Sequence, residues 1–198
     1  MPTPTPPADP LFAAGQSFLA VIDVQAAFLD KLAANEAPAL LARIVWLIAV
    51  ARAQGIPVIA MAEDVARHGG PVAAVREALP EGSDIHDKHV FGFAGQPAIL
   101  AAAEALGRRQ AVLVGLETDV CVAQSALGLQ AAGFRVAAIT DATGSPGQAH
   151  AAGLQRMGAA GIVLTTAKGI FYEWMRDLPT LARHLALKAA ARDAGVAL

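Results

Sequence analysis

Short apolar runs alternate along this chain with longer segments that carry helical spacing, and this rhythm limits the possible folds more than any other feature. Strands of a parallel sheet are buried on both faces, so they read as continuous apolar runs, and helices usually connect them. The alternation predicts an α/β fold with three layers, in which helices cover both faces of a doubly wound, Rossmann-like, six-stranded and mainly parallel sheet. The predicted strands are 17–24, 56–61, 83–89, 110–116, 134–140 and 161–166.

Helical spacing predicts the connecting elements. The predicted helices are 37–54, 71–79, 96–107, 119–132 and 147–158, followed by a last helix from about Ile170. Gly55, Gly107, Gly133 and Gly158 stand where helix C-termini need a residue that tolerates positive φ. These glycines therefore mark the expected junctions between helices and strands.

The N-terminal residues differ in composition from the rest of the chain. We expect residues 1–14, which begin MPTPTPPADP, to form a disordered, proline-rich leader. Residues 15–198 contain no internal repeat and no long linker, and they suffice for one domain with a sizeable core. A single domain should therefore follow the leader.

Composition argues against several classes of protein. Although 55% of the residues are hydrophobic, every apolar run is interrupted before it reaches the roughly 20 residues of a membrane span. Lys and Arg are scattered and the net charge is −2, which argues against a nucleic-acid partner. One cysteine cannot form an intrachain disulfide, and the N-terminus does not resemble a signal peptide. We expect a cytoplasmic protein that acts on a small molecule, without contact to a membrane.

Polar residues gather where the predicted strands end. Ligands of doubly wound sheets bind beyond the carboxyl ends of the strands, near the point where the strand order reverses. The candidates at these ends are Asp23, Gln25, Glu63, Asp64, Lys88, His89, Glu117 to Cys121, Asp141 and Thr143.

Cys121, the only cysteine, follows the fourth predicted strand in VLVGLETDVCVAQSAL. If Thr118 is the N-cap of the next helix, Cys121 lies in its first turn. The helix dipole and the free N–H groups there should lower the pKa of the thiol below the ordinary value of about 8.5, and they could hold an oxyanion. Alternatively, Cys121 is a small buried apolar residue, which the flanking Val120 and Val122 favour.

Two charged residues should lie at the same edge of the sheet as Cys121. Asp23 ends an apolar strand, where a buried carboxylate needs a partner, although it could instead cap the following loop. Lys88 ends the third predicted strand and could keep both a carboxylate and a thiolate ionised, although a lone lysine is more often solvated. The convergence of the three residues predicts a nucleophilic site.

At these residues the sequence resembles the isochorismatase-like cysteine hydrolases. The matching motifs are VIDVQ at 21–25, DKHVFGF at 87–93 and GLETDVCV at 115–122, in the family's order and spacing. The resemblance continues through TDATGS at 140–145 and LTTAKGIFYEWMRD at 164–177. It therefore covers most of the predicted domain, in a branch of the family whose substrate is unassigned.

The resemblance implies a triad of Asp23, Lys88 and Cys121. The Cys121 thiolate would attack a carbonyl carbon, Asp23 would be the general acid and base, and Lys88 would hold the Asp23 carboxylate and stabilise negative charge. It also implies a cis peptide between Leu116 and Glu117, and an oxyanion site formed by the N–H groups of Glu117 and Cys121.

Residues around the triad should contact the substrate. The expected pocket residues are Gln25, Phe28, Glu63, Phe91 and Thr118. Related nicotinamidases bind a metal through an aspartate and two histidines after the second strand, but here Val65 and Ala66 stand where the near histidine is expected. Glu63, Asp64 and His68 remain conceivable ligands, but we expect no metal and no cofactor.

Together these features predict a hydrolase that cleaves the C–N bond of a small amide or carbamoyl-type compound through a cysteine thioester. One alternative is hydrolysis of an enol ether of the isochorismate type, which does not require the cysteine. Another is a non-catalytic, oligomeric binding protein of the same fold. The resemblance also implies a homo-oligomer, a dimer or larger.

Overall fold

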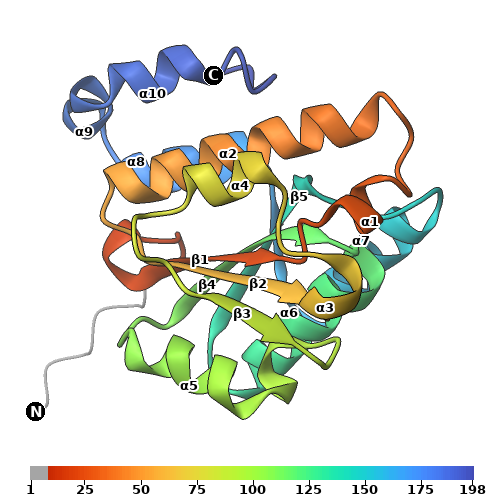
Figure 1. The fold of residues 1–198 in the computed structure, drawn as a ribbon. Coiled ribbons are helices and arrows are strands. Elements are labelled where there is room, and N and C mark those ends of the chain that lie inside the picture. Colours follow the sequence, from red (N-terminus) through yellow and green to blue (C-terminus); the bar gives the residue numbers. More distant parts are fainter. Residues whose placement is uncertain (1–8) are drawn as a thin grey trace, which may run out of the picture.

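The computed structural model describes residues 9–198 and contains a six-stranded sheet in which all strands are parallel (Figure 1). The strands are β1 (Ser17–Ile22), β2 (Val58–Glu63), β3 (Ile85–Lys88), β4 (Gln110–Leu116), β5 (Arg135–Gly144) and β6 (Val163–Thr165). Their order is β3-β2-β1-β4-β5-β6, so it reverses between β1 and β4. The predicted fold class is confirmed, and the sheet is parallel throughout.

Helices cover both faces of this sheet. In Figure 1, α2, α4 and α8 lie on one face and α5, α6 and α7 on the other. The helices are α1 (Ala26–Leu29), α2 (Glu36–Ala53), α3 (Val65–His68), α4 (Ala73–Ala78), α5 (Pro97–Ala105), α6 (Ala123–Ala131), α7 (Ala149–Ala159), α8 (Ala167–Met175), α9 (Leu178–Arg183) and α10 (Leu185–Ala190). Single 3-10 turns stand at Ala14–Gln16 and Phe93–Gly95, and a π-helical turn at Thr118–Val122 precedes α6.

Strand β1 lies in the middle of the sheet and is buried along its whole length. Leu19 and Val21 belong to the apolar core beneath α2 and α8, whereas Phe18 and Ile22 belong to the core beneath α5 and α6. This alternation follows from the two-residue period of a strand. Because both faces of β1 are covered, the residue that follows it, Asp23, enters a buried position at the end of the sheet.

Residues 1–8 of the predicted leader lie outside the described part of the chain. Residues 9–14 pack on the domain, because Phe12 is fully buried and the Asp9 carboxylate lies 2.7 Å from the Arg176 guanidinium. The packed part of the chain therefore begins before residue 15. Beyond this, the division into a leader and one domain stays a prediction.

Two expectations about helix ends were wrong. Gly158 lies within α7, and the positive φ after this helix belongs to Gly161, at 84°. The helix expected from about Ile170 begins at Ala167, and two further helices, α9 and α10, follow it. In Figure 1, α10 lies outside the layer formed by α2 and α8.

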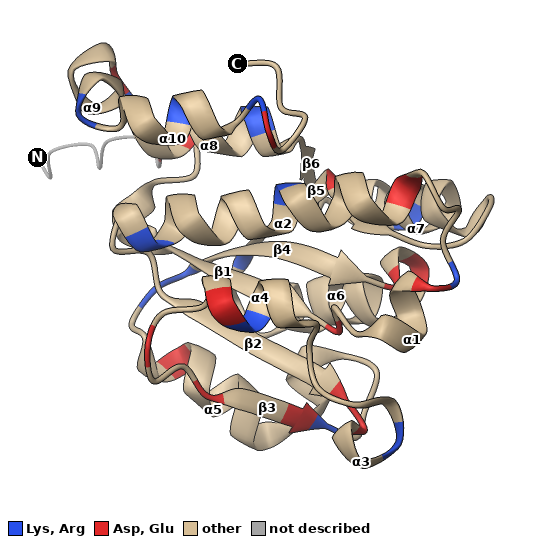
Figure 2. Ribbon diagram, turned by 45° about the horizontal axis from the view of Figure 1, so that its top comes forward, with Lys and Arg blue, Asp and Glu red and all other residues tan. Residues whose placement is uncertain are grey.

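Charged residues are spread over the ribbon. Figure 2 shows Lys and Arg dispersed over helices and loops, whereas acidic residues colour the ends of β2 and β3. Within residues 9–198, no helix is both long and apolar enough to cross a bilayer.

Candidate active site

Asp23, Lys88 and Cys121 come from three different strand ends. Asp23 follows β1 with a φ of 49°, Lys88 is the last residue of β3, and Cys121 lies in the π-helical turn after β4. Because all strands run parallel, their carboxyl ends meet at one edge of the sheet. Gly115 of β4 permits close packing there, since a Cβ at this position would lie 1.9 Å from the Ile22 carbonyl oxygen.

Lys88 and Asp23 form a fully buried ion pair. The Lys88 Nζ lies 3.0 Å from Asp23 Oδ2, and both side chains are 0% exposed. The same ammonium donates hydrogen bonds to the carbonyl oxygens of Val90, at 2.7 Å, and Phe91, at 3.3 Å. The Asp23 oxygens receive no well-directed hydrogen bond from residues 9–198. Their lone pairs are therefore open to a proton.

The Cys121 thiol completes the cluster, together with a second carboxylate. Its Sγ lies 3.8 Å from Lys88 Nζ and donates a hydrogen bond to Glu63 Oε2 at 3.4 Å. Glu63 Oε2 lies 3.6 Å from Lys88 Nζ. The structure thus brings together the three residues of the predicted triad and adds Glu63 to them.

Burial governs the ionisation of this cluster. Burial raises the pKa of Asp23 to about 6. The Lys88 ammonium lowers this pKa, but its effect is smaller than that of burial. Burial, and then the negative charge of Asp23, also raises the pKa of the Cys121 thiol well above its ordinary value. The expectation of a lowered thiol pKa was therefore wrong, because desolvation and a neighbouring carboxylate outweigh the helix terminus. The resting cysteine is a thiol that needs a base.

Thr118 does not cap the helix as expected. Residue Glu117 occupies the cap position of the π-helical turn, without a side-chain cap. Thr118 is fully buried, and its Oγ1 lies 2.8 Å from Nδ1 of His150 on α7. Gly153 of α7 packs against the same turn, since a Cβ there would lie 2.7 Å from Asp119 Cα. Helix α7 therefore supports the turn that carries Cys121.

Gln25 fixes the backbone of Glu63. The fully buried Gln25 side chain accepts a hydrogen bond from the Glu63 N–H at 2.8 Å and donates one to the Glu63 carbonyl at 2.9 Å. Its amide also donates to the Gly69 carbonyl at 2.6 Å. In the structure Gln25 positions the end of β2, and its expected place in the substrate pocket stays a prediction.

Phe28 and Phe91 were also expected to line the pocket. Phe28 is buried, with its ring 5.4 Å from the His68 ring and 4.7 Å from the Lys31 ammonium. Phe91 is 55% exposed and contributes its carbonyl to Lys88. Their contact with a substrate stays a prediction.

The peptide bond between Leu116 and Glu117 is cis. The Glu117 carboxylate pairs with the Lys31 ammonium at 3.1 Å. The roles of the Glu117 and Cys121 N–H groups stay predictions.

Residues 17–168 match the Isochorismatase domain family. The chain belongs to the isochorismatase family. Isochorismatase domain-containing protein 1 from Salmo salar is 35% identical over 132 residues, which are 66% of this chain and 46% of that protein. This chain thus spans less than half the length of that relative.

Solved structures of isochorismatase-like proteins share the fold. YcaC from Escherichia coli, an octameric hydrolase of unknown specificity, superposes with a TM-score of 0.83 at 23% identity, covering 92% of this chain and 91% of YcaC. YcaC from Pseudomonas aeruginosa, which contains hexane-2,5-diol and covalent acrylamide, gives a TM-score of 0.80 at 25% identity, covering 94% and 98%.

Glu63, Asp64 and His68, which the sequence offered as conceivable metal ligands, do not come together in the structure. Within the described residues, the acidic, histidine and cysteine side chains that come close enough to share an ion are Asp23, Glu63 and Cys121, all within 4.8 Å of one another. Asp64 and His68 are not part of this group. The converging group does not fit a divalent cation, because the Lys88 ammonium already lies 3.0 Å from Asp23 and 3.6 Å from Glu63.

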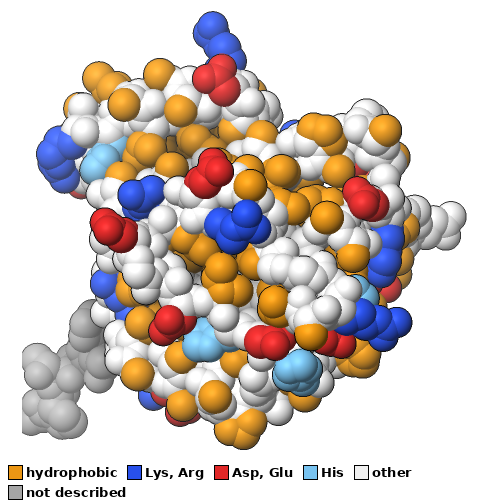
Figure 3. Space-filling model, in the orientation of Figure 1, with side chains coloured by type: hydrophobic (Ala, Val, Ile, Leu, Met, Phe, Trp, Pro, Cys, Tyr) orange, Lys and Arg blue, Asp and Glu red, His pale blue; other side chains and the backbone are white. Residues whose placement is uncertain are grey.

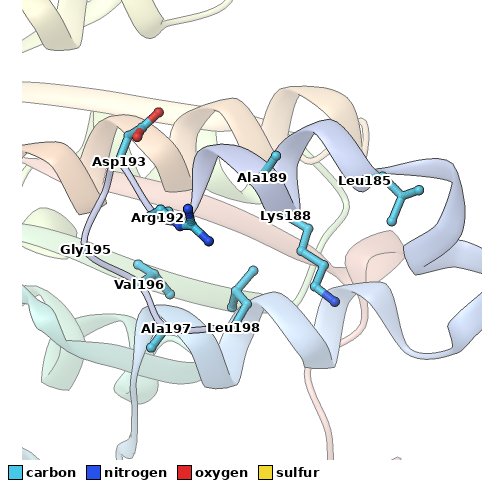
Figure 4. Close-up of a pocket in the computed structure, with 9 residues that line it drawn as sticks. All are labelled: Leu185, Lys188, Ala189, Arg192, Asp193, Gly195, Val196, Ala197 and Leu198. Atoms are coloured by element: carbon cyan, nitrogen blue, oxygen red, sulfur yellow. The ribbon is translucent and has the colours of Figure 1, made fainter.

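Other cavities lie away from these residues. A cavity of about 970 Å³ lies between α10 and the C-terminal tail (Figure 4). Its lining residues are Leu185, Lys188, Ala189, Arg192, Asp193, Gly195, Val196, Ala197 and Leu198. We call it the C-terminal groove. None of the triad residues contributes to it.

Sequence reasoning missed three supporting features of the site. The Val90 carbonyl and the His150 side chain gave no recognisable signal, since their contacts join distant or irregular segments. Gly153 did give one, because an isolated glycine within a helical pattern often marks a close approach. It could have indicated that α7 packs on the turn of Cys121.

Proposed function

We propose that this protein is a hydrolase that cleaves the C–N bond of a small amide or carbamoyl-type compound through a thioester on Cys121. The observation that carries the proposal is the buried cluster in which a protonated thiol lies beside a base, Asp23, and an ammonium, Lys88. A pKa of about 6 for Asp23 suits a group that must accept and return a proton near neutral pH.

The proposed reaction begins with proton transfer from the Cys121 thiol to Asp23. The thiolate attacks the carbonyl carbon, and the N–H groups of Glu117 and Cys121 bind the oxyanion of the tetrahedral intermediate. The C–N bond breaks as Asp23 returns the proton to nitrogen, so a neutral amine leaves and a thioester remains. The buried ammonium of Lys88, 3.8 Å from Sγ, stabilises the thiolate.

Hydrolysis of the thioester uses the same groups. Asp23, again a carboxylate, takes a proton from a water molecule that attacks the thioester carbon. The second tetrahedral intermediate then expels the Cys121 thiolate, which regains the proton from Asp23. The sum is one amide and one water consumed, with one acid and one amine released.

The solved structure of one relative contains a covalently bound small molecule. The structure of YcaC from P. aeruginosa contains covalent acrylamide, which is a small neutral amide. Enol ether hydrolysis, the alternative considered above, leaves the cysteine without a role, although Cys121 lies at the centre of the cluster.

The deciding experiment screens small amides, carbamoyl compounds and isochorismate against the wild type, Cys121→Ala and Asp23→Asn. We expect amide or carbamoyl turnover in the wild type, only background with Cys121→Ala, and a loss of about 10²–10⁴-fold with Asp23→Asn. Circular dichroism checks that each variant folds. Full activity in both variants would contradict the thioester mechanism, and turnover of isochorismate alone would favour the enol ether reaction.

We propose in addition that the protein is a homo-oligomer. YcaC from E. coli is octameric. Large apolar side chains are exposed on the C-terminal helices of this chain, with Leu178 at 78% and Leu185 at 60%. Figure 3 shows hydrophobic side chains scattered over this face of the molecule, including its upper part, where these helices lie. Sedimentation velocity tests the proposal, and a monomer at micromolar concentration would contradict it. An oligomer without any turnover would favour the non-catalytic alternative.

A further inference from the structure

The cluster contains a carboxylate that the proposed mechanism does not use. Asp23, Lys88 and Cys121 suffice for thioester chemistry, yet Glu63 Oε2 lies 3.4 Å from the nucleophilic sulfur. Counting both carboxylates as anions, Lys88 as a cation and the thiol as neutral, the cluster carries one excess negative charge.

Lys88 is not available to bind an anionic substrate. Its ammonium donates to the carbonyl oxygens of Val90 and Phe91, at 2.7 and 3.3 Å, and faces the Cys121 sulfur at 3.8 Å. The Asp23 carboxylate also lies against it, at 3.0 Å. An ammonium has only three donors, so these interior partners occupy all of them. Its side chain is also 0% exposed.

Glu63 is the charged member of the cluster that reaches solvent. Its side chain is 18% exposed, whereas Asp23 and Lys88 are fully buried. Both of its contacts within the cluster use Oε2, and Oε1 receives no hydrogen bond from residues 9–198. A molecule that approaches Cys121 therefore meets a carboxylate with an acceptor oxygen to spare.

The backbone that carries this carboxylate is held from within. The buried Gln25 amide pairs with both the N–H and the carbonyl of Glu63, so the end of β2 cannot shift without breaking two hydrogen bonds. A preorganised acceptor favours ligands that donate and repels ligands that carry negative charge.

From this arrangement we infer that Glu63 determines specificity. It accepts a hydrogen bond from an N–H group next to the carbon that Cys121 attacks, and it excludes compounds with a carboxylate at that place. The substrate is thus an uncharged or cationic compound rich in N–H groups. This inference deepens the proposed function, but recognition at Glu63 is testable without turnover.

The test compares two alkylating reagents that differ in one group. Iodoacetamide carries a neutral amide with two N–H donors, and iodoacetate carries a carboxylate at the same position. Because the chain contains one cysteine, mass spectrometry reports the alkylation rate of Cys121 directly. The measured quantity is the rate ratio, amide over acetate, relative to the same ratio for free cysteine. This ratio cancels changes in the nucleophilicity of the thiol.

We expect the wild-type ratio to exceed that of free cysteine by about 10-fold or more, from repulsion at close range. Glu63→Gln should lower it about 10-fold, whereas Glu63→Asp, which keeps the charge, should stay within about threefold of the wild type. Glu104→Gln removes the same charge from the exposed face of α5 and serves as the matched control.

An unchanged ratio in Glu63→Gln would overturn the inference, as would a wild-type ratio equal to that of free cysteine. If Glu63→Gln does not fold, the wild-type ratio and Glu63→Asp still decide. A shifted ratio without any amide turnover would preserve the role of Glu63 in recognition and contradict the hydrolase. If amide turnover depends on Cys121 but the ratio is unchanged in Glu63→Gln, the hydrolase is supported and the role of Glu63 in recognition is contradicted.

Discussion

The triad and the C-terminal groove are opposite kinds of region. The groove is a cavity of about 970 Å³ lined by apolar residues and by the charged side chains of Lys188, Arg192 and Asp193. The triad is tightly packed, yet it buries a carboxylate and an ammonium completely. Burying charges costs several kcal/mol per ion unless they are paired, and folding alone does not require it. Buried charge therefore marks the reactive region better than cavity size.

Of the substitutions considered, removal of Lys88 should lower the free energy of unfolding most. Lys88→Met leaves the Asp23 carboxylate buried without its cation, and we expect a loss of about 3–5 kcal/mol in the free energy of unfolding, measured with urea. The double variant Lys88→Met with Asp23→Asn removes both charges and should recover most of this loss. In this double variant, Cys121 should nevertheless be alkylated no faster than an ordinary cysteine. If the double variant is as unstable as the single one, the two residues do not form the pair described.

The pH dependence of stability should separate Asp23 from every residue of the groove. The folded pKa of Asp23, about 6, lies above its ordinary value of 3.8, so its protonated form favours the folded state. This contribution is fully present below about pH 4 and is lost as the pH rises through 6. At 1.36 kcal/mol per pKa unit, the wild type should lose about 3 kcal/mol relative to Asp23→Asn between pH 4 and 7.

Urea unfolding at four pH values measures this difference. Substitutions in the groove, such as Leu185→Asn, should show the wild-type pH profile. An identical profile in Asp23→Asn would mean that the pKa of Asp23 is not raised.

A smaller loss of stability is expected when the packing of α7 against the turn of Cys121 is disturbed. Gly153→Ala places a methyl group 2.7 Å from the backbone of Asp119, so α7 or the π-helical turn must move. We expect a loss of about 1–3 kcal/mol in the free energy of unfolding, together with slower alkylation of Cys121. Gly158→Ala, in the same helix, meets only the end of the flexible Leu164 side chain at 3.2 Å. It should be nearly neutral, and equal losses in both variants would contradict the role of Gly153.

The smallest effect should come from the groove. Leu185 is 60% exposed, so Leu185→Asn should change the free energy of unfolding of the isolated protomer by less than about 0.5 kcal/mol. Its Cys121 alkylation rate should equal that of the wild type. A slowed alkylation in this variant would show that the two regions are coupled.

The sequence determined the fold class and the location of the site, because both follow from local patterns. Apolar runs placed the strands to within a few residues, and polar residues at their ends pointed to Asp23, Lys88 and Cys121. The direction of the thiol pKa could not be predicted in this way. It depends on how completely Cys121 is buried and on its distance from carboxylates of other strands, which only the packed structure determines.

Contacts with distant segments also escaped prediction, because tertiary contacts override local preference. Thr118 has a side chain suited to helix capping, but its hydroxyl bonds to His150 of a later helix. The Gln25 side chain holds the backbone of Glu63, which the sequence did not indicate. In both cases the partner is distant in sequence, so no local pattern indicates it.

The pH dependence of Cys121 alkylation by iodoacetamide tests the central claim, that Asp23 is the base of a buried thiol. The rate in the wild type should rise through about pH 6, as Asp23 ionises, and Asp23→Asn should lack this rise. If both proteins instead react only above about pH 8.5, with the same profile, Cys121 is an ordinary cysteine and the account is wrong.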